Sequence, residues 1–254
     1  MRTVRIAIGV LAMRTPFRWV PRAGSLHAHT IDSLMRSSLF ALFAFCVLAQ
    51  VLLVAGIVLR REQRARFSPA WRWAATAAVA VLFVWMTIAA EKLWSTIRLT
   101  RAEPHAVQVE VTGVQFQWYF RYPGPDGIYG RTKPELIDAA GGNPLGLDPS
   151  DPRSHDDIVS SILVLPVNQQ ANLQLRAQDV VHGFFLPAMR VMQNATPGRV
   201  SEFHLTPNRT GDYAIVCSQV CGLGHYRMHA VLRVLSAQQF VIWMSQREAA
   251  QMDR

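Results

Sequence analysis

The spacing of hydrophobic positions divides the chain into two parts. Residues 39–59 are apolar except for Gln50, and a helix of that length spans the hydrocarbon core of a bilayer. A short basic turn, Arg60–Arg66, joins this run to a second apolar run at about residues 73–94. From residue 106 onward, apolar and polar positions alternate with a period of two, which is typical of half-buried strands. The pattern therefore predicts a transmembrane helical hairpin followed by a β domain.

Turn residues divide the β domain into short strand-like runs. These runs lie near residues 107–111, 115–122, 158–164, 171–176, 183–186, 200–205, 212–216 and 230–235. Many short strands with frequent turn signals favour an antiparallel sandwich or barrel. After them, Ser236 and Gln239 have the spacing of a capping box, which predicts a C-terminal packing helix.

A segment rich in Pro, Gly and Asp interrupts the β domain. It covers about residues 123–157, which is long for a connection between two strands. We interpret it as a surface loop and call it the insertion. The predicted organisation has four parts: a basic tail (1–37), the hairpin (38–98), the β domain with its insertion (99–236) and a C-terminal helix (237–254).

The net charge of +9 belongs to the part that contains the apolar runs. Residues 1–100 carry 13 Lys and Arg against three acids, a formal charge of +10, whereas residues 101–254 carry 13 against 14, a charge of −1. The β domain therefore lacks the basic surface of a nucleic-acid-binding protein. The basic turn predicts a cytoplasmic connection with both termini outside, although the arginines of the tail argue for the opposite orientation.

Four side chains that can bind a metal lie within twelve residues: Cys217, Cys221, His225 and Met228. Thiolate and thioether sulfur select copper, and imidazole also suits it. A blue-copper site uses one Cys, whereas two neighbouring thiolates can bridge two copper ions. A symmetric dinuclear site then needs one more imidazole, which His182 offers. Two other interpretations of the cysteine pair are a disulfide and the C-x-x-x-C motif of a membrane-anchored copper chaperone.

The motifs D-V-x-H, P-G-R and C-x-x-x-C-G-x-x-H-x-x-M resemble those of subunit II of the haem–copper cytochrome c oxidases, which carries the dinuclear CuA centre. In this chain they begin at Asp179, Pro197 and Cys217. The resemblance extends to the aromatic segment 113–120 and to the two apolar runs, so it covers roughly residues 38–240. It implies a cupredoxin-like Greek-key sandwich or barrel as the fold of the β domain.

The resemblance also implies roles for the matching residues. It assigns six copper ligands: His182, the bridging Cys217 and Cys221, His225, Met228 and the backbone carbonyl of Gln219. Most members have Glu in place of Gln219, and that carboxylate helps to bind magnesium. Because Gln219 lacks the charge that a hard cation prefers, magnesium binding is doubtful. Trp118 aligns with the surface tryptophan through which cytochrome c passes its electron; the alternative is an aromatic residue of a strand in the core. Asp179 is a candidate for fixing the loop of His182, and the alternative is an ordinary acid at a turn.

As a whole, the resemblance implies the electron-accepting subunit of a respiratory oxidase. Such a chain takes electrons from a c-type cytochrome or a similar periplasmic donor and passes them to haem in subunit I, where oxygen is reduced to water. It belongs to an oxidoreductase complex of the bacterial inner membrane, with the copper domain on the periplasmic side and the insertion near the donor or a neighbouring subunit. The copper subunit of a nitric-oxide-reducing relative is the alternative, because the acceptor chemistry lies in the partner.

Overall fold

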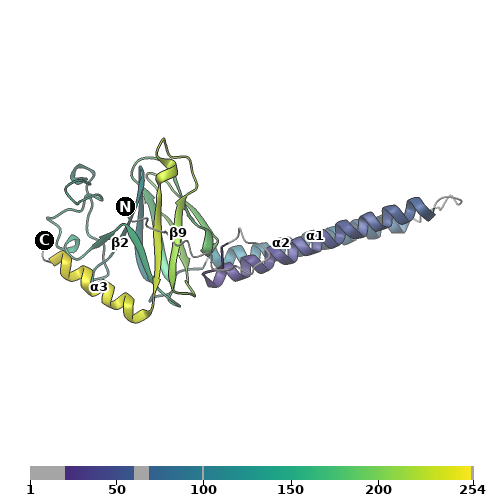
Figure 1. Ribbon diagram of the computed structural model, residues 1–254, viewed down its shortest axis with the longest axis horizontal. Helices are drawn as coiled ribbons and strands as arrows, with labels where there is room; N and C mark the ends of the chain where they lie inside the picture. The colour runs from purple at the N-terminus through teal and green to yellow at the C-terminus, as the bar shows by residue number, and fades with distance from the viewer. Residues whose placement is uncertain (1–20, 60–68, 99, 253–254) are drawn as a thin grey trace, which may run out of the picture.

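The computed structural model describes residues 21–59, 69–98 and 100–252 (Figure 1). Two long helices, α1 (Leu26–Leu59) and α2 (Pro69–Arg98), lie side by side and extend from one end of a β domain. Their apolar parts are unburied, and both helices are long and apolar enough to cross a membrane. The core helix of a soluble protein would be covered instead. The basic turn and the first 20 residues of the tail, on which the predicted orientation depends, lie outside the described residues.

Helix α1 begins at Leu26, well before the predicted apolar run, so the last part of the predicted tail is helical. The hydroxyl of Ser25 caps the helix by accepting a hydrogen bond from the Ala28 amide at 3.1 Å. Asp32 pairs with Arg190 of the β domain at 2.8 Å. The pair of Asp32 with Arg190 attaches the start of α1 to the β domain, and hydrophobic spacing alone does not indicate it.

Within the described residues, ten strands form two five-stranded sheets. Their bounds are β1 (Val107–Val114), β2 (Gln117–Tyr122), β3 (Ile158–Ser160), β4 (Ile162–Pro166), β5 (Ala171–Ala177), β6 (His182–Leu186), β7 (Val191–Ala195), β8 (Ser201–Leu205), β9 (Gly211–Cys217) and β10 (His229–Leu235). One sheet has the order β3-β2-β1-β5-β8 and the other the order β4-β10-β9-β6-β7. The prediction of a two-sheet β domain after a helical hairpin is confirmed.

The two sheets are mixed, which corrects the prediction of an antiparallel arrangement. Strand β1 pairs with β5 in parallel and β10 pairs with β4 in parallel, whereas the other pairs are antiparallel. Parallel neighbours need a long crossover connection, and here β2, the insertion, β3 and β4 lie between β1 and β5. Alternation within one strand carries no information on which distant strand will pair with it.

Two details of the strand prediction are also wrong. The run at 158–164 is two strands, because the chain leaves one sheet after Ser160 and joins the other at Ile162. The Ser160 hydroxyl accepts a hydrogen bond from the Ile162 amide at 3.1 Å, which stabilises this change of direction. Strand β7 is missing from the prediction, because its sequence has no clear alternation. It pairs with β6 along the whole length of that strand.

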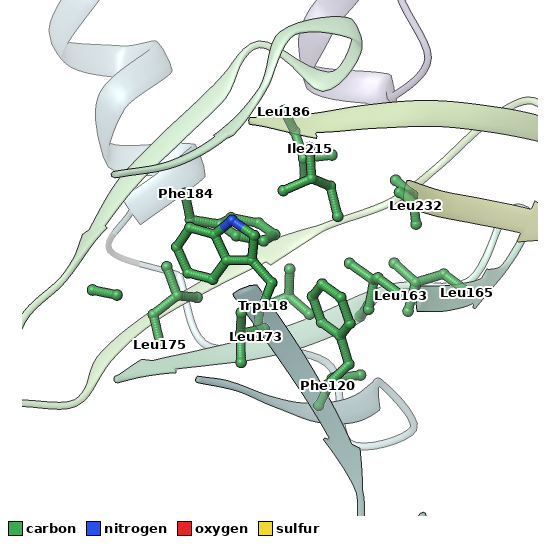
Figure 2. Packing of buried hydrophobic residues seen from close by; sticks show 14 of the residues in the cluster. Trp118, Phe120, Leu163, Leu165, Leu173, Leu175, Phe184, Leu186, Ile215 and Leu232 are labelled. Atoms are coloured by element: carbon green, nitrogen blue, oxygen red, sulfur yellow. The ribbon is translucent and has the colours of Figure 1, made fainter. Parts of the chain in front are cut away.

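The hydrophobic core lies between the two sheets (Figure 2). Trp118 and Phe120 of β2 meet Phe184 of β6 edge to face, with ring centroids 5.2 and 6.4 Å apart. Buried Leu and Ile side chains from β4, β5, β6, β9 and β10 fill the space around these rings. Both sheets therefore contribute one apolar face to a single core, as the alternating pattern predicts.

The C-terminal helix α3 (Ala237–Met252) packs along the β domain (Figure 1). Its Trp243 lies against Tyr122 of β2, with ring centroids 5.2 Å apart. The Gln239 amide donates to the Ser236 hydroxyl at 3.3 Å, and the Ser236 amide donates to the Gln239 side chain at 3.2 Å. The predicted capping box is therefore confirmed.

The insertion is a folded loop attached to the sheet by a buried arginine. It contains two short 3-10 helices, η1 (Pro134–Leu136) and η2 (Pro152–Ser154). Arg121 of β2 is 1% exposed and donates to the carbonyl of Gly130 and to the carboxylate of Asp157. Polar and ionic contacts therefore hold the insertion against its sheet, whereas apolar side chains hold the two sheets of the sandwich together.

Candidate metal centre

The metal loop, residues 217–229, connects β9 to β10. The Cys217 amide donates to the carbonyl of Met228 at 3.1 Å, so strand pairing brings the two ends of the loop together. Between them, the 3-10 helix η4 (His225–Arg227) turns the His225 ring towards Cys221. Four side chains that are spread over twelve residues of sequence thus gather at one point.

His182 reaches the same point from the neighbouring strand β6. This strand pairs with β9, and Phe184 lies opposite Cys217 in the register. The ligand atoms of His182, Cys217 and Cys221 all lie within 4.8 Å of one another. A Cβ atom on Gly113 of β1 would lie 2.8 Å from the His182 ring, so the missing side chain makes room for the imidazole.

The sulfur of Cys221 lies at the middle of the predicted ligands. It is 3.8 Å from Cys217 Sγ, 3.6 Å from His225 Nδ1 and 3.7 Å from Met228 Sδ. The sulfur of Cys217 is 3.1 Å from the carbonyl oxygen of Gln219. Both cysteines are free thiols, at a separation far above the roughly 2.05 Å of a disulfide bond. The structure therefore brings together all six of the residues predicted as ligands.

Asp179 holds the His182 ring in one orientation. Its carboxylate lies 2.8 Å from His182 Nε2, and its other oxygen accepts a hydrogen bond from the Gln115 amide at 2.7 Å. With the proton on Nε2, the lone pair of Nδ1 is free. Nδ1 is buried and has no hydrogen-bond partner among the described residues. A buried nitrogen without a partner is costly, so this atom fits a metal ligand better than a packing histidine.

The surroundings of Cys221 and Asp179 shift the pKa values of these two groups in opposite directions. Burial, followed by the hydrogen bond and charge of Cys217, raises the pKa of the Cys221 thiol to about 11. A metal that binds the thiolate form must therefore displace a proton at neutral pH. Burial acts to raise the pKa of Asp179, but hydrogen bonds from His182 and from the amides of Gln115 and Val180 outweigh it and lower that pKa. Asp179 is thus ionised at neutral pH, and it accepts the hydrogen bond of the His182 imidazole.

Trp118 is not at the surface, so that part of its prediction is wrong. The side chain is 0% exposed and meets the His182 ring edge to face, with centroids 5.8 Å apart. Strand alternation explains the burial, because Trp118 and Phe120 share the inner face of β2 while Gln117 and Tyr119 face outward. Its proposed role in electron transfer remains a prediction, now for a residue inside the domain.

The aromatic side chain in contact with the metal loop is Phe116, which the sequence does not single out. It is partly exposed, and a Cβ atom on Gly224 would lie 2.3 Å from its ring. The neighbouring Gln115 side chain donates to the carbonyl of Cys221. The turn between β1 and β2 therefore supports the metal loop from outside. The only signal in the sequence is that both residues belong to the aromatic segment 113–120.

Comparisons with known proteins show which proteins the chain is similar to. A family model described as the periplasmic domain of cytochrome C oxidase subunit II matches residues 107–235, about half of the chain. An alternative cytochrome c oxidase subunit 2 from Bradyrhizobium diazoefficiens is 37% identical over 145 residues, which are 56% of this chain and 52% of that protein. Cytochrome c oxidase subunit 2 from Cereibacter sphaeroides is 29% identical over 150 residues, 55% of this chain and 49% of that protein.

The chain thus spans about half the length of the curated relatives it matches. Among solved structures, it is similar to the periplasmic domain of subunit II of cytochrome oxidase (CoxB) from Bradyrhizobium japonicum. That comparison gives 26% identity and a TM-score of 0.43, and it covers 59% of this chain and 97% of the other.

Proposed function

The chain belongs to the family of cytochrome C oxidase subunit II, periplasmic domain, and from that premise we propose that it accepts electrons at a dinuclear copper centre of a respiratory oxidase. The donor is a c-type cytochrome or a similar periplasmic carrier. The acceptor is haem in a partner subunit I, where oxygen is reduced to water. The observation that carries the proposal is the cluster of thiol, imidazole and thioether groups around Cys221.

The donor set of the cluster fits copper. Two thiols, two imidazoles, a thioether and a carbonyl converge there, and soft sulfur with imidazole nitrogen is the combination that copper prefers. In the proposal, Cys217, Cys221, His182 and His225 would hold the copper ions, and Met228 and the carbonyl of Gln219 would be weak ligands. When bound, the copper pair supplies the capacity to take up and release one electron.

The residues of the chain favour electron transfer over chemistry on a substrate. Protein groups supply every ligand of the proposed site, so no coordination position is left for a reactant. Cys221 and Met228 are 4% and 2% exposed, and His182 is fully buried. A dry and rigid ligand shell limits rearrangement when the charge changes, and its hydrogen bonds tune the reduction potential. Asp179 serves this purpose by fixing the ring of His182.

Magnesium is not part of the proposal. Gln219 contributes its backbone carbonyl to the cluster, and its side chain is an uncharged amide. Magnesium prefers carboxylate oxygens.

The helical hairpin anchors the site to a membrane in this proposal. Helices α1 and α2 are long and apolar enough to cross a bilayer and are unburied within the chain, which leaves their apolar surface to lipid and to other oxidase subunits. The family match is to a periplasmic domain, which supports a bacterial inner-membrane location with the β domain on the outer side. A soluble donor then reaches the metal centre without crossing the membrane.

The experiment that tests the proposal measures copper in the purified full-length chain after reconstitution. We expect two copper ions per chain and an electron paramagnetic resonance spectrum in which one electron is shared equally by two copper nuclei. One copper per chain, or a spectrum from a single nucleus, contradicts the dinuclear assignment.

A matched pair of methionine substitutions locates the thioether ligand. Met228→Leu removes the sulfur that lies 3.7 Å from Cys221, so it changes the copper hyperfine pattern. Met189→Leu replaces a fully buried methionine that lies outside the ligand set and leaves the pattern unchanged. Equal spectra for the two variants would remove Met228 from the site.

A further inference from the structure

Gln115 is bonded to two sides of the candidate metal centre, although it is not one of the predicted ligands. It lies between β1 and β2. Its main-chain amide donates to one carboxylate oxygen of Asp179 at 2.7 Å, and the other oxygen of Asp179 lies 2.8 Å from His182 Nε2. Its side-chain amide donates to the main-chain carbonyl of Cys221. This single residue therefore connects the loop before β6 with the metal loop.

These contacts form a continuous chain of hydrogen bonds along one side of the centre. The chain begins at the imidazole of His182, runs through the carboxylate of Asp179 to Gln115, and ends at the carbonyl of Cys221. The two residues at its ends have ligand atoms within 4.8 Å of each other. The chain thus closes a ring with the ligands, so a movement of either end alters the geometry of the whole ring.

The peptide group between Cys221 and Gly222 is turned so that its carbonyl meets Gln115. Gly222 has a φ of +135°, which residues with a side chain rarely adopt. A Cβ atom at this position would also lie 2.8 Å from Gln115 Nε2. The glycine therefore allows the backbone conformation and leaves room for the side-chain amide, and the hydrogen bond depends on both residues.

The side-chain donor of Gln115 lies beside the residue at the middle of the ligand set. Cys221 is 4% exposed, and its sulfur contacts three other predicted ligands. In surroundings with little water, the positive end of an N–H dipole acts strongly on nearby charge. A donor at the Cys221 carbonyl therefore stabilises the site when it holds an additional electron, whereas the carboxylate of Asp179 disfavours that electron.

We infer that Gln115 is a positioning residue that raises the reduction potential of the centre through its hydrogen bond to the Cys221 carbonyl. This inference rests on the proposed function and adds a determinant of the same site. The step that it affects is the transfer of one electron, in which the donor protein is oxidised by one electron and the site is reduced by one. Because Gln115 acts on the site itself, an equilibrium measurement without the donor protein detects its effect.

The test is a redox titration of the purified full-length chain after reconstitution with copper. Gln115→Met keeps the approximate length of the side chain and removes its N–H donor. We expect the equilibrium constant for reduction by a reference redox couple to fall by about two- to tenfold, the range for loss of one hydrogen bond. Gln117→Met is the matched control, because it makes the same change at an exposed glutamine two positions along the chain, and it leaves the constant unchanged.

Gln115→His separates loss of the donor from a general loosening of the loop. A neutral imidazole offers an N–H donor at a reach similar to that of the glutamine amide. At about pH 8, where a free imidazole is uncharged, this variant restores most of the equilibrium constant that Gln115→Met loses. Equal constants for the two variants contradict the role of the donor.

A second measurement uses the copper-free chain. The His225 amide at the start of η4 donates to the carbonyl of Gly222 at 3.1 Å, directly after the peptide group that Gln115 holds. Gln115→Met therefore speeds hydrogen exchange of the His225 amide by about two- to tenfold. The amides of β10 that pair with β9 keep their protection, because the strand pairing is not altered.

The outcomes distinguish this inference from the proposed function. Absence of the shared-electron copper signal in the unmodified chain contradicts the proposed function. With that signal present, an equilibrium constant for Gln115→Met equal to or above that of Gln117→Met overturns the inference, as does unchanged hydrogen exchange at His225. Failure of Gln115→Met to retain two copper ions also overturns it, because the residue is then required for assembly of the site rather than for its potential.

Discussion

The metal loop and the insertion are both irregular connections in the same β domain, but they satisfy their polar groups in opposite ways. In the metal loop, thiol, imidazole and thioether groups face one another, and the pKa of the Cys221 thiol is raised to about 11. In the insertion, carboxylates meet arginine, lysine and backbone amides. The carboxylates of the insertion are therefore neutralised by cations of the chain itself, whereas the thiol, imidazole and thioether groups of the metal loop fit a metal ion from outside the chain.

Because of this difference, substitutions in the two segments are expected to have different consequences. Loss of a ligand from the metal loop removes a function while the strands on both sides continue to pair. Loss of a buried charge from the insertion leaves other charges without a partner and affects stability instead. Four substitutions or conditions test this contrast.

The largest effect is expected for Cys221→Ser. Its sulfur contacts Cys217, His225 and Met228, so the substitution removes the atom that all three share. We expect copper to be lost and turnover of the oxidase complex to fall by about 100-fold or more. Circular dichroism of the copper-free chain stays unchanged. The control is Cys46→Ser, an exposed free thiol on α1, which retains copper and activity; equal losses in both variants would contradict the assignment.

The next effect concerns stability. Arg121→Met leaves Asp157 buried without its cation, whereas Glu110 keeps its contact with Arg176 at 3.0 Å, and the free energy of unfolding falls by about 3–5 kcal/mol. Thermal unfolding of the copper-free chain measures the loss. The matched control is Arg233→Met, which breaks a half-exposed pair with Asp212 and costs about 1 kcal/mol or less. Similar losses for the two variants would show that the insertion is not held by its buried charges.

The contrast also explains which parts could be predicted from the sequence. The ligands in the metal loop are close in sequence, and metal chemistry restricts both their type and their spacing, so the motif indicates the site directly. His182 joins them through strand pairing: the donor set calls for one more imidazole, but only the resemblance to a family selects His182 among the histidines of the chain. The contacts of Arg121 with Gly130 and Asp157 follow no such rule. Nothing in the spacing of the insertion predicts which of its acids will be buried.

The sequence-based prediction also differs from the structure where two sequence signals conflict or where no sequence signal exists. For Trp118, the resemblance favours the surface, whereas the alternation of β2 places it inside with Phe120, and the alternation is correct. The parallel pairs β1–β5 and β10–β4 depend on the path of the whole chain and have no local signal. The contact of Phe116 with Gly224 depends on a turn whose position the sequence does not determine.

A smaller effect is expected for Asp179→Asn, which keeps the shape of the contact with His182 and removes its charge. Removal of a negative charge near the centre favours uptake of an electron, so the reduction potential rises. Copper affinity falls by about tenfold, because the carboxylate no longer supports the imidazole. A redox titration and a chelator competition measure the two quantities. Asp212→Asn is the control, and a potential that is the same in both variants would exclude Asp179 from this role.

The smallest effect is a local dependence on pH that separates the insertion from the metal loop. Hydrogen bonds from Ser150 and Lys133 hold the pKa of Asp148 well below its usual range. A lowered pKa in the folded state means that the ionised form stabilises the fold. This stabilisation is fully present above about pH 4, the pKa in the unfolded chain, and is lost as the pH falls through the pKa in the folded chain.

Hydrogen exchange of the Lys133 amide, which donates to Gly146 at 2.7 Å, should therefore lose protection below about pH 4. The Met228 amide should keep its protection, because the metal loop contains no carboxylate. Asp148→Asn should abolish the difference between high and low pH at Lys133, and an unchanged pH profile in that variant would assign the effect to another group.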